Sequence, residues 1–576
     1  MDWRLKEKLA ARLSRERGYY VYPPGGRARF ALVYPNSYFV GMSNLGLHII
    51  YDILNRRPDT ACERFFLPEK REMEAHLRTR TPLMSAETQT ELPAFDLIGF
   101  AVSFEMDYFN IPAMLEAGRV PPLAAERGSY DPVVIAGGPC ATFNPEPLSL
   151  FFDAFIIGEG EETVGRFMDA FLASRAAGEP RDGLLLRLAG IPGVYVPSLY
   201  EHVHGEDGRL SAIRPAAGAP AKVARQWVRG LDDYPAHTVV VTEDTEFNLY
   251  LLETSRGCGR HCRFCMAGYC FRRPRNRSLS SLEEEIRAAR SCGKRIGLMG
   301  AAISDYPEID ALSRFITAEG LTMSVASFRA DSVTETLVES LAKSGMRTLT
   351  LAPEAGSERM RAVINKGIGE RDLFRAMALG MAAGVRRYRL YIMVGLPYER
   401  AEDVDDVAAL ASRLKAYLDG GGGGTLTLSV NPFIPKPFTP FQWLPMAERS
   451  YLDGAMARLK KAVARMKGVE MIAEPVKSAL TQGVLARGDR RVARALWEAH
   501  LMGGAKAFMR AMKGAGLDAD FYLRRTRGRD EIFPWDVLDM GVRRSYLFEE
   551  LERAQRGAAT PACFDGCRRC GVCRNE

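Results

Sequence analysis

The sequence predicts an α/β protein, in which a doubly wound domain precedes a partial barrel and a helical C-terminal region. Short continuous apolar runs alternate with helical stretches from residue 28 to about 180. A regular alternation of strands and helices begins again near residue 249, and the pattern from 446 to about 555 is helical. Runs that are apolar on both faces are typical of parallel strands covered by helices, so both α/β regions are expected to contain parallel sheets.

Size and composition limit the class of protein. The chain has 576 residues, of which 47% are hydrophobic and 26% are charged. This length favours several domains over one continuous core. No run approaches the 18 apolar residues of a membrane span, and the first residues lack the apolar centre of a signal peptide. Seven of the eleven cysteines fall in two tight groups, which suits metal binding in a reducing cytoplasm better than disulfide formation. We therefore expect a cytoplasmic protein.

Changes in pattern divide the chain into six segments. They are an N-terminal helix (1–27), a doubly wound α/β domain (28–180), a β-rich connector (181–247), a (βα)6 core (248–445), a helical domain (446–555) and a four-cysteine tail (556–576).

The α/β domain at 28–180 has the pattern of a Rossmann or flavodoxin-like fold. Its predicted strands are Phe30–Tyr34, Asp96–Ser103, Val133–Ala136 and Ala154–Ile157. Small or turn-forming residues follow them, among them Ser103, Gly137, Gly138 and Gly158. Open α/β sheets bind ligands at the carboxyl ends of their strands, so these four residues are candidate ligand contacts.

The connector contains His202 and His204, which would share one face of a strand. Such a pair can bind a metal, but no accompanying carboxylate pattern supports a metal site here. A solvated hairpin is the favoured interpretation.

From residue 249 the sequence predicts six βα units of a TIM-like partial barrel. The predicted strands are Tyr250–Leu252, Arg295–Gly300, Thr322–Phe328, Arg347–Leu351, Arg389–Val394 and Thr425–Val430. A capping box at Ser281–Glu284 is expected to open the first long helix, and Gly320, Gly345 and Gly384 are expected to end later helices. In closed eight-unit barrels the chemistry lies at the carboxyl ends of the strands.

A cysteine loop, Cys258-Gly-Arg-His-Cys262-Arg-Phe-Cys265, directly follows the first barrel strand. Three thiolates on one short loop can hold three irons of a four-iron cluster. Because such clusters normally take four cysteine ligands, one iron would keep an open position, as in catalytic metal sites. The alternative is a zinc loop with Cys270 as the fourth ligand.

The loop spacing, followed by βα units, resembles the radical S-adenosylmethionine (SAM) superfamily. The resemblance implies that Cys258, Cys262 and Cys265 hold a [4Fe–4S] cluster whose free iron chelates the amino and carboxylate groups of SAM. One electron from the cluster then cleaves SAM to a 5′-deoxyadenosyl radical, which modifies an unidentified substrate. A reductant such as flavodoxin or ferredoxin would supply the electron.

The same resemblance implies a set of residues around SAM at the strand ends. They are Phe264 in the loop, Gly300 and Ala301 after strand two, Ser327 and Arg329 after strand three, Glu354 after strand four, and Gly395 and Leu396 after strand five. Arginine can pair bidentately with a carboxylate, and Glu354 can accept hydrogen bonds from ribose hydroxyls or the amino group. Ala301 departs from the family pattern, in which an acidic residue is common.

The segments "IAGGPC" and "IIGEGEE" resemble the cobalamin-binding domain that precedes the barrel in many radical SAM proteins. Ser103, Gly137 and Gly138 match positions that face the corrin or its nucleotide tail. The Asp-x-His-x-x-Gly motif of the axial histidine is absent, and His48 is expected to be an ordinary helix residue. Either a corrinoid binds without a histidine ligand, or the domain keeps the fold without the cofactor.

Arginines gather around the cysteine loop and again in the helical region. The first group is Arg256, Arg260, Arg263, Arg272, Arg273, Arg275 and Arg277; the second is Arg487, Arg490, Arg491, Arg494, Arg524, Arg525, Arg527 and Arg529. The first group indicates either a phosphate-bearing or acidic partner or a solvated basic face that neutralises a cluster. RNA, protein and a small molecule all remain open as substrates.

The tail carries Cys563, Cys567, Cys570 and Cys573 within eleven residues. This set can hold zinc or a second four-iron cluster. The whole chain resembles radical SAM proteins with a cobalamin-binding-like domain and a C-terminal cysteine-rich tail. The functions that follow are cobalamin-dependent methylation or a related radical modification, or a methylthiotransferase-like reaction that uses a second cluster. A zinc-dependent nucleic-acid-binding protein is the alternative from another class.

Overall fold

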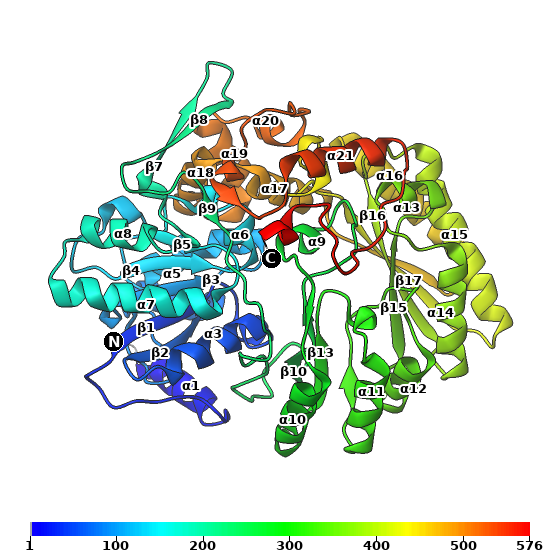
Figure 1. Ribbon diagram of the computed structural model, residues 1–576, viewed down its shortest axis with the longest axis horizontal. Coiled ribbons are helices and arrows are strands. Elements are labelled where there is room, and N and C mark those ends of the chain that lie inside the picture. The colour runs from blue at the N-terminus through cyan, green and yellow to red at the C-terminus, as the bar shows by residue number, and fades with distance from the viewer. Residues whose placement is uncertain (1–2, 576) are drawn as a thin grey trace. The chain divides into compact units, whose positions relative to one another are not determined.

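The computed structural model describes residues 3–575 and consists of two compact units (Figure 1). The N-terminal unit comprises residues up to 249 together with 484–522 and 530–541. The barrel unit comprises 250–483, 523–529 and 542–576. The helical region predicted as one domain at 446–555 is thus divided, because parts of it pack with each unit. Helices α17 (Val476–Arg487) and α20 (Ala519–Leu523) each cross a division.

The N-terminal unit is built on a six-stranded sheet in the order β2-β1-β3-β4-β5-β6. The strands are β1 Ala28–Tyr34, β2 Thr60–Phe66, β3 Leu97–Ala101, β4 Val133–Gly137, β5 Ala154–Ile156 and β6 Val194–Tyr195. β1 to β5 run parallel, and β6 is antiparallel to β5. Because the chain leaves β1 in one direction to reach β2 and in the other to reach β3, the topological switch point lies between β1 and β3.

Helices cover both faces of this sheet (Figure 1). They are α1 Trp3–Leu13, α2 Tyr38–Gly41, α3 Leu45–Arg56, α4 Lys70–Thr79, α5 Asn110–Ala117, α6 Pro139–Phe143, α7 Gly160–Ala177 and α8 Arg181–Ala189, with α18 Arg490–Leu501 and α19 Phe508–Gly514 from the C-terminal half. The core between the sheet and α3 and α7 includes Phe30, Leu97, Ile135 and Phe167, all fully or almost fully buried. The predicted doubly wound fold is confirmed.

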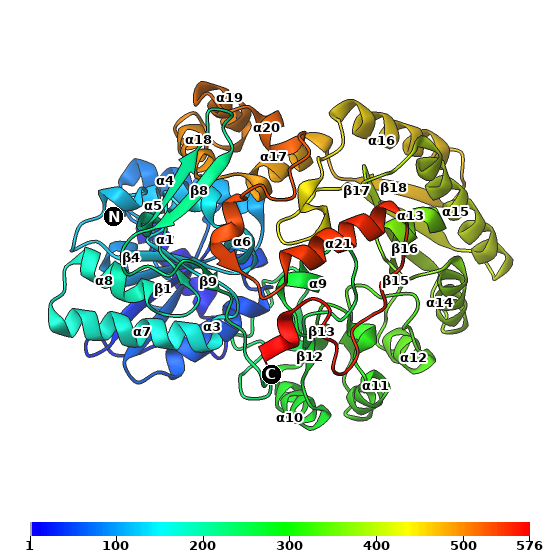
Figure 2. The same cartoon turned by 45° about the horizontal axis from the view of Figure 1, so that its top comes forward.

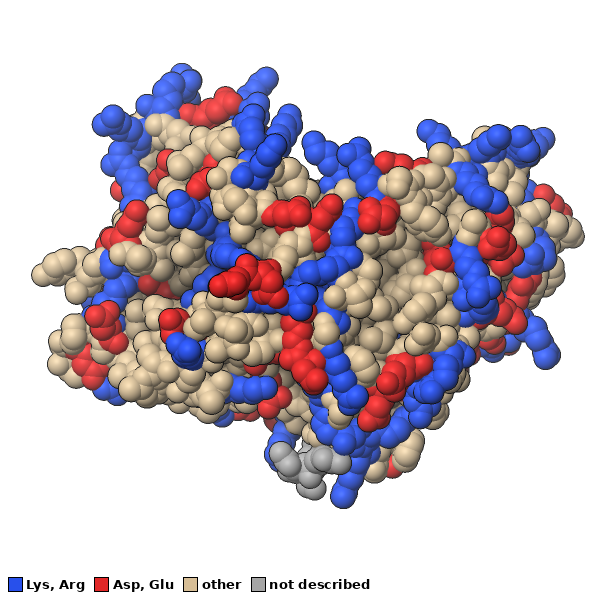
Figure 3. All heavy atoms as spheres, turned by 90° about the horizontal axis from the view of Figure 1, so that it is seen from above, with Lys and Arg blue, Asp and Glu red and all other residues tan. Residues whose placement is uncertain are grey.

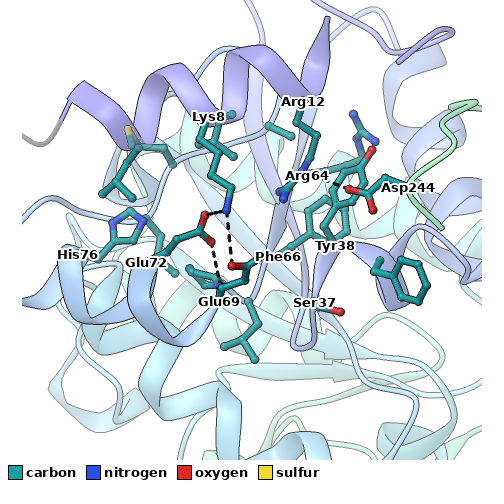
Figure 4. Close-up of a pocket in the computed structure, with 18 residues that line it drawn as sticks. Lys8, Arg12, Ser37, Tyr38, Arg64, Phe66, Glu69, Glu72, His76 and Asp244 are labelled. Carbon is teal, nitrogen blue, oxygen red and sulfur yellow. Dashed lines mark hydrogen bonds and ion pairs between the residues drawn. The ribbon is translucent and has the colours of Figure 1, made fainter. Parts of the chain in front are cut away.

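β2 was not predicted, because Glu63 and Arg64 interrupt its apolar pattern. The Arg64 side chain is nevertheless buried, and its guanidinium pairs with Glu87 at 2.6 Å and Glu16 at 2.5 Å. Figure 4 shows the small cavity, of about 130 Å³, that adjoins this arginine beneath α1. Lys8 on α1 reaches across it to Glu69 and Glu72. Pairing of charges therefore explains a buried strand that has a polar sequence.

The connector contains the predicted hairpin, β7 Tyr200–His204 and β8 Leu210–Pro215. β9 (Val223–Ala224) pairs with β19 (Leu538–Asp539). Most residues of the hairpin are exposed or half-buried, as expected of a solvated hairpin, but its two histidines lie beside carboxylates. The His202 side chain is fully buried 3.6 Å from Glu146, and His204 lies 3.7 Å from Asp489. Both carboxylates come from segments that are distant in the sequence, so no local sequence motif predicts these contacts.

The two larger sheets of the barrel unit contain the six predicted strands and one more, β18. β10 Leu249–Glu253, β13 Arg295–Met299 and β14 Met323–Ser324 form one sheet; β15 Thr348–Glu354, β16 Arg387–Val394, β17 Thr425–Pro432 and β18 Val469–Ala473 form the other. The pairings of β13 with β14 and of β15 through β18 are parallel. β14 is shorter than the predicted Thr322–Phe328, although Phe328 still bridges to Leu351 and joins the two sheets.

Helices α10, α11, α12, α14, α15 and α16 lie around the outside of the partial barrel (Figure 1), while the short α9 and α13 follow strand ends and α21 comes from the C-terminal segment. They are α9 Ala267–Cys270, α10 Leu279–Ala289, α11 Ile309–Ala318, α12 Glu335–Lys343, α13 Glu358–Val363, α14 Glu370–Ala382, α15 Ala401–Gly420, α16 Arg449–Val463 and α21 Arg544–Gln555. Gly320, Gly345 and Gly384 adopt positive φ after helices, as predicted. The N-cap of α10 is Ser278 and not Ser281, because the helix begins three residues earlier than the predicted capping box. Between residues 3 and 575 we find no helix with the length and apolarity needed to cross a bilayer.

Candidate functional site

The cysteine loop lies at the carboxyl end of β10, as the sequence predicts. The short strands β11 (Ser255–Arg256) and β12 (Arg275–Asn276) pair antiparallel and close the base of the loop. Gly257 has φ of 78°, and a Cβ atom there would lie 2.1 Å from the carbonyl oxygen of Phe271. Only glycine therefore fits where the loop leaves the strand.

Within the loop, Cys262 is buried while Cys258 and Cys265 are partly exposed. The backbone N–H of Arg260 donates to Cys258 Sγ at 3.4 Å. Arg329 Nη1 lies 3.8 Å from Cys262 Sγ. Burial raises the pKa of the Cys258 thiol, and burial together with Cys262 raises that of Cys265 to about 11. Three sulfur donors beside an arginine fit a [4Fe–4S] cluster, which carries negative charge when bound by thiolates.

Arg329 follows β14 and is held from several sides. It donates to Asp331 through Nε and Nη2, both at 3.1 Å, and to the carbonyl oxygen of Lys366 at 2.8 Å. Its side chain is almost buried. These bonds fix the guanidinium beside Cys262, so the predicted SAM-site arginine lies next to the thiols.

Lys366 is a site residue that sequence reasoning missed. Its ammonium is buried, lies 3.1 Å from Glu354 Oε1 and stands 5.8 Å from the centre of the Phe264 ring. Burial alone would lower the pKa of Lys366, but Glu354 and Cys262 outweigh burial and raise it. The segment Asn365-Lys366-Gly367 follows α13 and carried no strand signal, although the positive φ of Asn365 and Gly367 marks a tight turn. Lys366 and Arg329 together place two cations beside the cysteine loop.

Glu354 ends β15 and points its carboxylate to Lys366. Its φ is 67°, in the left-handed region that a residue with a side chain rarely adopts. Backbone strain of this kind persists where the surroundings hold it, often at functional sites. The prediction that places Glu354 at the rim thus agrees with its position, and its partner in the structure is Lys366.

The turn after β16 is organised by Glu399. Its carboxylate accepts hydrogen bonds from the N–H of Gly395 at 2.7 Å and from the hydroxyl of Tyr451 at 2.9 Å, and the N–H of Leu396 lies 3.4 Å away. Burial raises the pKa of Glu399 to about 7, against the lowering effect of these donors. Glu399 therefore sets the shape of the turn predicted to contact adenine.

The other predicted rim residues follow β13 and β14. Gly300 and Ala301 are exposed directly after β13, and Ser327 is partly exposed after β14. A Cβ atom on Gly300 would lie 2.7 Å from Ser255 Oγ, so the backbone there packs closely on the strand that leads into the cysteine loop. Ala301 has only a methyl side chain, which cannot accept a hydrogen bond from an amine.

In the N-terminal unit the predicted ligand contacts lie at the carboxyl ends of β3, β4 and β5. Ser103 Oγ accepts a hydrogen bond from Asn44 Nδ2 at 3.2 Å. Gly138 and Gly158 have φ of 98° and 103°, and Cβ atoms there would lie 2.8 Å from Val102 O and 2.1 Å from Gln226 O. The protein's own backbone therefore requires both glycines. Gly137, the last residue of β4, has no such close contact within 3.9 Å.

Two phenylalanines stand exposed at this edge. Phe39 follows β1 and is 43% exposed, and Phe104 follows β3 and is 44% exposed. Because β1 and β3 are neighbours, both residues lie at the switch point of the sheet. Open α/β sheets bind ligands at this switch point, so both side chains lie where a ligand of the sheet would contact them.

His48 cannot serve as an axial ligand in this conformation. Its Nε2 lies 3.1 Å from Met42 O, and its Nδ1 lies 3.4 Å from the N–H of Val240. Burial lowers the pKa of His48 to about 4, so the ring is neutral. Both nitrogens are thus committed to backbone groups, as expected for a helix residue.

Most arginines around the cysteine loop are internal and do not form a solvated basic face. Arg263, Arg272, Arg275 and Arg277 are buried. Arg256 and Arg277 bind Glu253, and Arg260 binds Asp305 and Asp331. In the second group Arg487 is buried, Arg490 binds Glu146 and Arg491 binds Asp489. On the face shown in Figure 3, exposed lysines and arginines are interspersed with acidic residues. The buried and paired arginines therefore do not form a phosphate-binding surface, which was one of the two alternatives for the group around the loop.

The four tail cysteines belong to the barrel unit. Figure 2 shows the segment that follows α21 returning past α9 and β12 to the C-terminus. Cys567 and Cys570 are buried, and Cys563 and Cys573 are partly exposed. The N–H of Cys563 donates to the carbonyl oxygen of Gly259 at 2.8 Å, so the tail contacts the cysteine loop directly.

The raised pKa of Glu399 predicts a pH dependence of stability. The folded-state pKa of about 7 lies above the ordinary value of 4.5. The folded state therefore keeps a proton that the unfolded state loses, and this contribution to stability falls by up to about 3 kcal/mol as the pH rises from 4.5 to 7. Glu399→Gln should flatten the pH dependence of the denaturant midpoint between pH 5 and 7.5. The exposed Glu339 on α12 gives the control Glu339→Gln; parallel curves for wild type and Glu399→Gln would contradict the assignment.

Two family models match the chain. The model described as "Radical SAM proteins, N-terminal" matches residues 46–197, and the model of the radical SAM superfamily matches 252–411. The second match contains the cysteine loop and the strand ends that carry Arg329, Glu354 and Gly395.

Similar proteins agree with these matches. An uncharacterized protein of Methanocaldococcus jannaschii, MJ0966, is 30% identical over 470 residues, which are 81% of this chain and 90% of that protein. MJ0865 of the same organism, provisionally named a methylthiotransferase, is 25% identical over 285 residues, which are 47% of this chain and 55% of that protein.

Among solved structures, the radical SAM methyltransferase TsrM from Kitasatospora setae, with cobalamin and a [4Fe–4S] cluster bound, covers 85% of this chain and 99% of its own length. Its TM-score is 0.51 at 15% identity, which shows a shared fold. With the cysteine loop, its two cations and the barrel in place, the chain belongs to the radical SAM superfamily and is an enzyme that uses SAM and a [4Fe–4S] cluster.

Proposed function

We propose that this enzyme cleaves SAM to a 5′-deoxyadenosyl radical, which abstracts hydrogen from an unactivated carbon of a substrate, and that Arg329, Lys366 and Glu354 position SAM. When bound, the cluster on Cys258, Cys262 and Cys265 supplies the electron for this cleavage. The observation that carries the proposal is the placement of two buried cations, Arg329 and Lys366, beside Cys262.

The roles of the three residues follow from their chemistry. The carboxylate of SAM is an anion, and Lys366 offers an ammonium that Glu354 holds in place. Arg329 is already bound bidentately by Asp331, so it acts as a fixed positive charge beside the thiolates. Glu354 has further acceptor capacity for the amino group or the ribose hydroxyls. Because these groups are buried, their interactions are stronger than they would be in water.

A corrinoid in the N-terminal unit is the second part of the proposal. The exposed Phe39 and Phe104 at the switch point fit the apolar face of a corrin ring, and Asn44 and Ser103 offer polar groups beside them. His48 is committed to the backbone, so we propose that the corrinoid binds without a histidine from α3. With a corrinoid, the reaction would be a methylation or a related carbon-centred modification.

Two rival functions receive less support. The hypothesis of a zinc-dependent nucleic-acid-binding protein requires the arginine groups to form an exposed basic surface. Most of the arginines around the loop are instead buried or paired with carboxylates. A methylthiotransferase-like reaction would draw on the tail cysteines, and the similarity to MJ0865 covers 47% of this chain. We therefore favour radical modification of an organic substrate whose identity is open.

Cluster-dependent SAM cleavage is tested by product formation. Under anaerobic conditions with dithionite, the reconstituted wild type should form 5′-deoxyadenosine, and Cys262→Ala should abolish its formation because the cluster loses a ligand. Cys292→Ala, which removes another partly exposed thiol of the barrel unit, should retain activity. Persistence of 5′-deoxyadenosine in Cys262→Ala, measured by chromatography, would refute the role of the loop.

The role of Lys366 is tested by SAM affinity. Lys366→Met keeps the length of the side chain but removes a charged hydrogen bond worth about 1.5–3 kcal/mol, so SAM binding should weaken about 10- to 100-fold. Lys366→Arg should restore part of the affinity. The exposed Lys343 on α12 supplies the control Lys343→Met. Equal SAM affinity in wild type and Lys366→Met, by calorimetry on cluster-loaded protein, would remove Lys366 from the site.

Corrinoid binding is tested by retention after loading. Wild type incubated with hydroxocobalamin and desalted should keep about one corrinoid per chain. Phe104→Asp should lower that content several-fold because a charge replaces the apolar contact. Tyr130→Asp changes a fully exposed aromatic residue elsewhere in the same unit and should keep the wild-type content. No retained corrinoid in wild type, by its absorption spectrum, would leave this unit with the fold alone.

A further inference from the structure

The C-terminal tail is fastened to the cysteine loop by backbone and side-chain hydrogen bonds. Arg263, between Cys262 and Phe264, donates from Nη2 to Ala558 O at 2.6 Å. Asn365 exchanges two hydrogen bonds with the backbone of Thr560, at 2.9 and 3.0 Å. The N–H of Cys563 donates to Gly259 O at 2.8 Å. The tail thus lies at a fixed place on the loop.

All four tail thiols line a single hollow. Its volume is about 330 Å³. The lining consists of Cys563, Cys567, Cys570 and Cys573 with Arg272, Arg273, Pro274, Phe564, Asp565, Gly566, Arg568 and Val572. One water molecule requires about 10–15 Å³ of volume measured in this way, so the hollow is much larger than one ion requires. Four thiol ligands select zinc, copper(I) or iron–sulfur clusters.

Positive and hydrogen-bonding groups stand at the sulfur atoms. Arg569 Nε donates to Cys567 Sγ at 3.3 Å, and Arg272 Nη1 lies 3.7 Å from Cys563 Sγ. Hydrogen bonds to the sulfurs and nearby charge are the means by which proteins set the reduction potential of an iron–sulfur cluster. The hollow therefore has the size and the polarity that an anionic cluster needs.

One side chain of the cysteine loop contacts a tail sulfur. His261 Nε2 lies 3.5 Å from Cys563 Sγ, and His261 directly precedes Cys262 in the chain. The ring is buried and held on its other nitrogen by Tyr546 Oη at 2.6 Å and Arg272 Nη2 at 3.0 Å. A rigid path of few bonds therefore joins a ligand of the loop to a thiol of the tail.

We propose that Cys563, Cys567, Cys570 and Cys573 bind a second [4Fe–4S] cluster, which exchanges single electrons with the cluster of the loop across the contact between His261 and Cys563. A one-electron reductant, such as dithionite or a reduced ferredoxin or flavodoxin, gives one electron to the tail cluster. That cluster passes the electron to the loop cluster and returns to its oxidised state. Only the exchange step rests on the proposed function, since the tail site is argued from its own residues.

Metal content tests the site. Wild type reconstituted anaerobically with iron and sulfide, in the presence of equimolar zinc, should contain about eight irons and eight sulfides per chain, four from each cluster. Cys570→Ala and Cys262→Ala should each lose half of both, and Cys292→Ala should lose neither. The proposal of a tail cluster would be overturned if the wild type contained about four irons and one zinc, and if Cys570→Ala lost only the zinc. Full iron content in Cys262→Ala would instead contradict the cluster proposed for the cysteine loop. The iron content of Cys570→Ala would then decide the tail cluster by itself.

Electron paramagnetic resonance of the reduced proteins tests the exchange. Two reduced clusters in contact should broaden each other's signals, so the wild-type spectrum should differ from the sum of the spectra of Cys570→Ala and Cys262→Ala. Each variant keeps one cluster, so its own signal also shows that the protein is folded around that cluster. A wild-type spectrum equal to the sum would overturn the close approach of the two clusters on which the proposed exchange depends.

Discussion

A single buried guanidinium, that of Arg263, joins the parts of the barrel unit on which the site depends. It lies inside the cysteine loop and is fully buried. It binds the carboxylate of Glu550 on α21 at 3.1 Å, the carbonyl oxygens of Ala362 and Val363 at the end of α13, and the backbone of the tail at Ala558. A buried ion pair of this kind costs about 3–5 kcal/mol when one partner is removed. The protein therefore fixes the loop by charge pairing and does not leave its position to the metal alone.

The other arginines of the loop follow the same principle. Glu253 at the end of β10 holds Arg256 and Arg277, while Asp305 and Asp331 hold Arg260. Each guanidinium has a fixed planar set of donors, so it can tie several backbone and carboxylate groups together at once. The result is a short irregular loop, with few backbone hydrogen bonds of its own, that is nevertheless rigid. Rigidity matters here because metal ligands must be held in place by their surroundings.

The sequence predicted the barrel well because strand and helix patterns depend on local periodicity. The apolar runs at Arg389–Val394 and Thr425–Val430 and the helix-ending Gly345 needed no knowledge of distant residues. β2 was missed because the pairing of Arg64 with Glu16 and Glu87 joins three distant segments. Lys366 was missed for the same reason, since only the fold brings it to Glu354 and Phe264. Residue type shows that an arginine is charged, but only tertiary structure shows whether solvent or a carboxylate balances that charge.

Residues whose burial or backbone conformation is energetically unfavourable distinguish functional positions from structural ones more reliably than glycine motifs do in this protein. Gly138 and Gly158 matched a cofactor-binding pattern, yet close approach of the protein's own backbone explains both. Lys366 and Glu354 have no comparable packing explanation. A buried lysine is unfavourable unless it is paired, and its partner Glu354 occupies left-handed backbone at φ of 67°. Natural sequences accept such local conflicts mainly where function requires them. The coincidence of a buried cation and a strained carboxylate beside Cys262 therefore supports our proposal for the SAM site by an argument that is independent of the cysteine spacing.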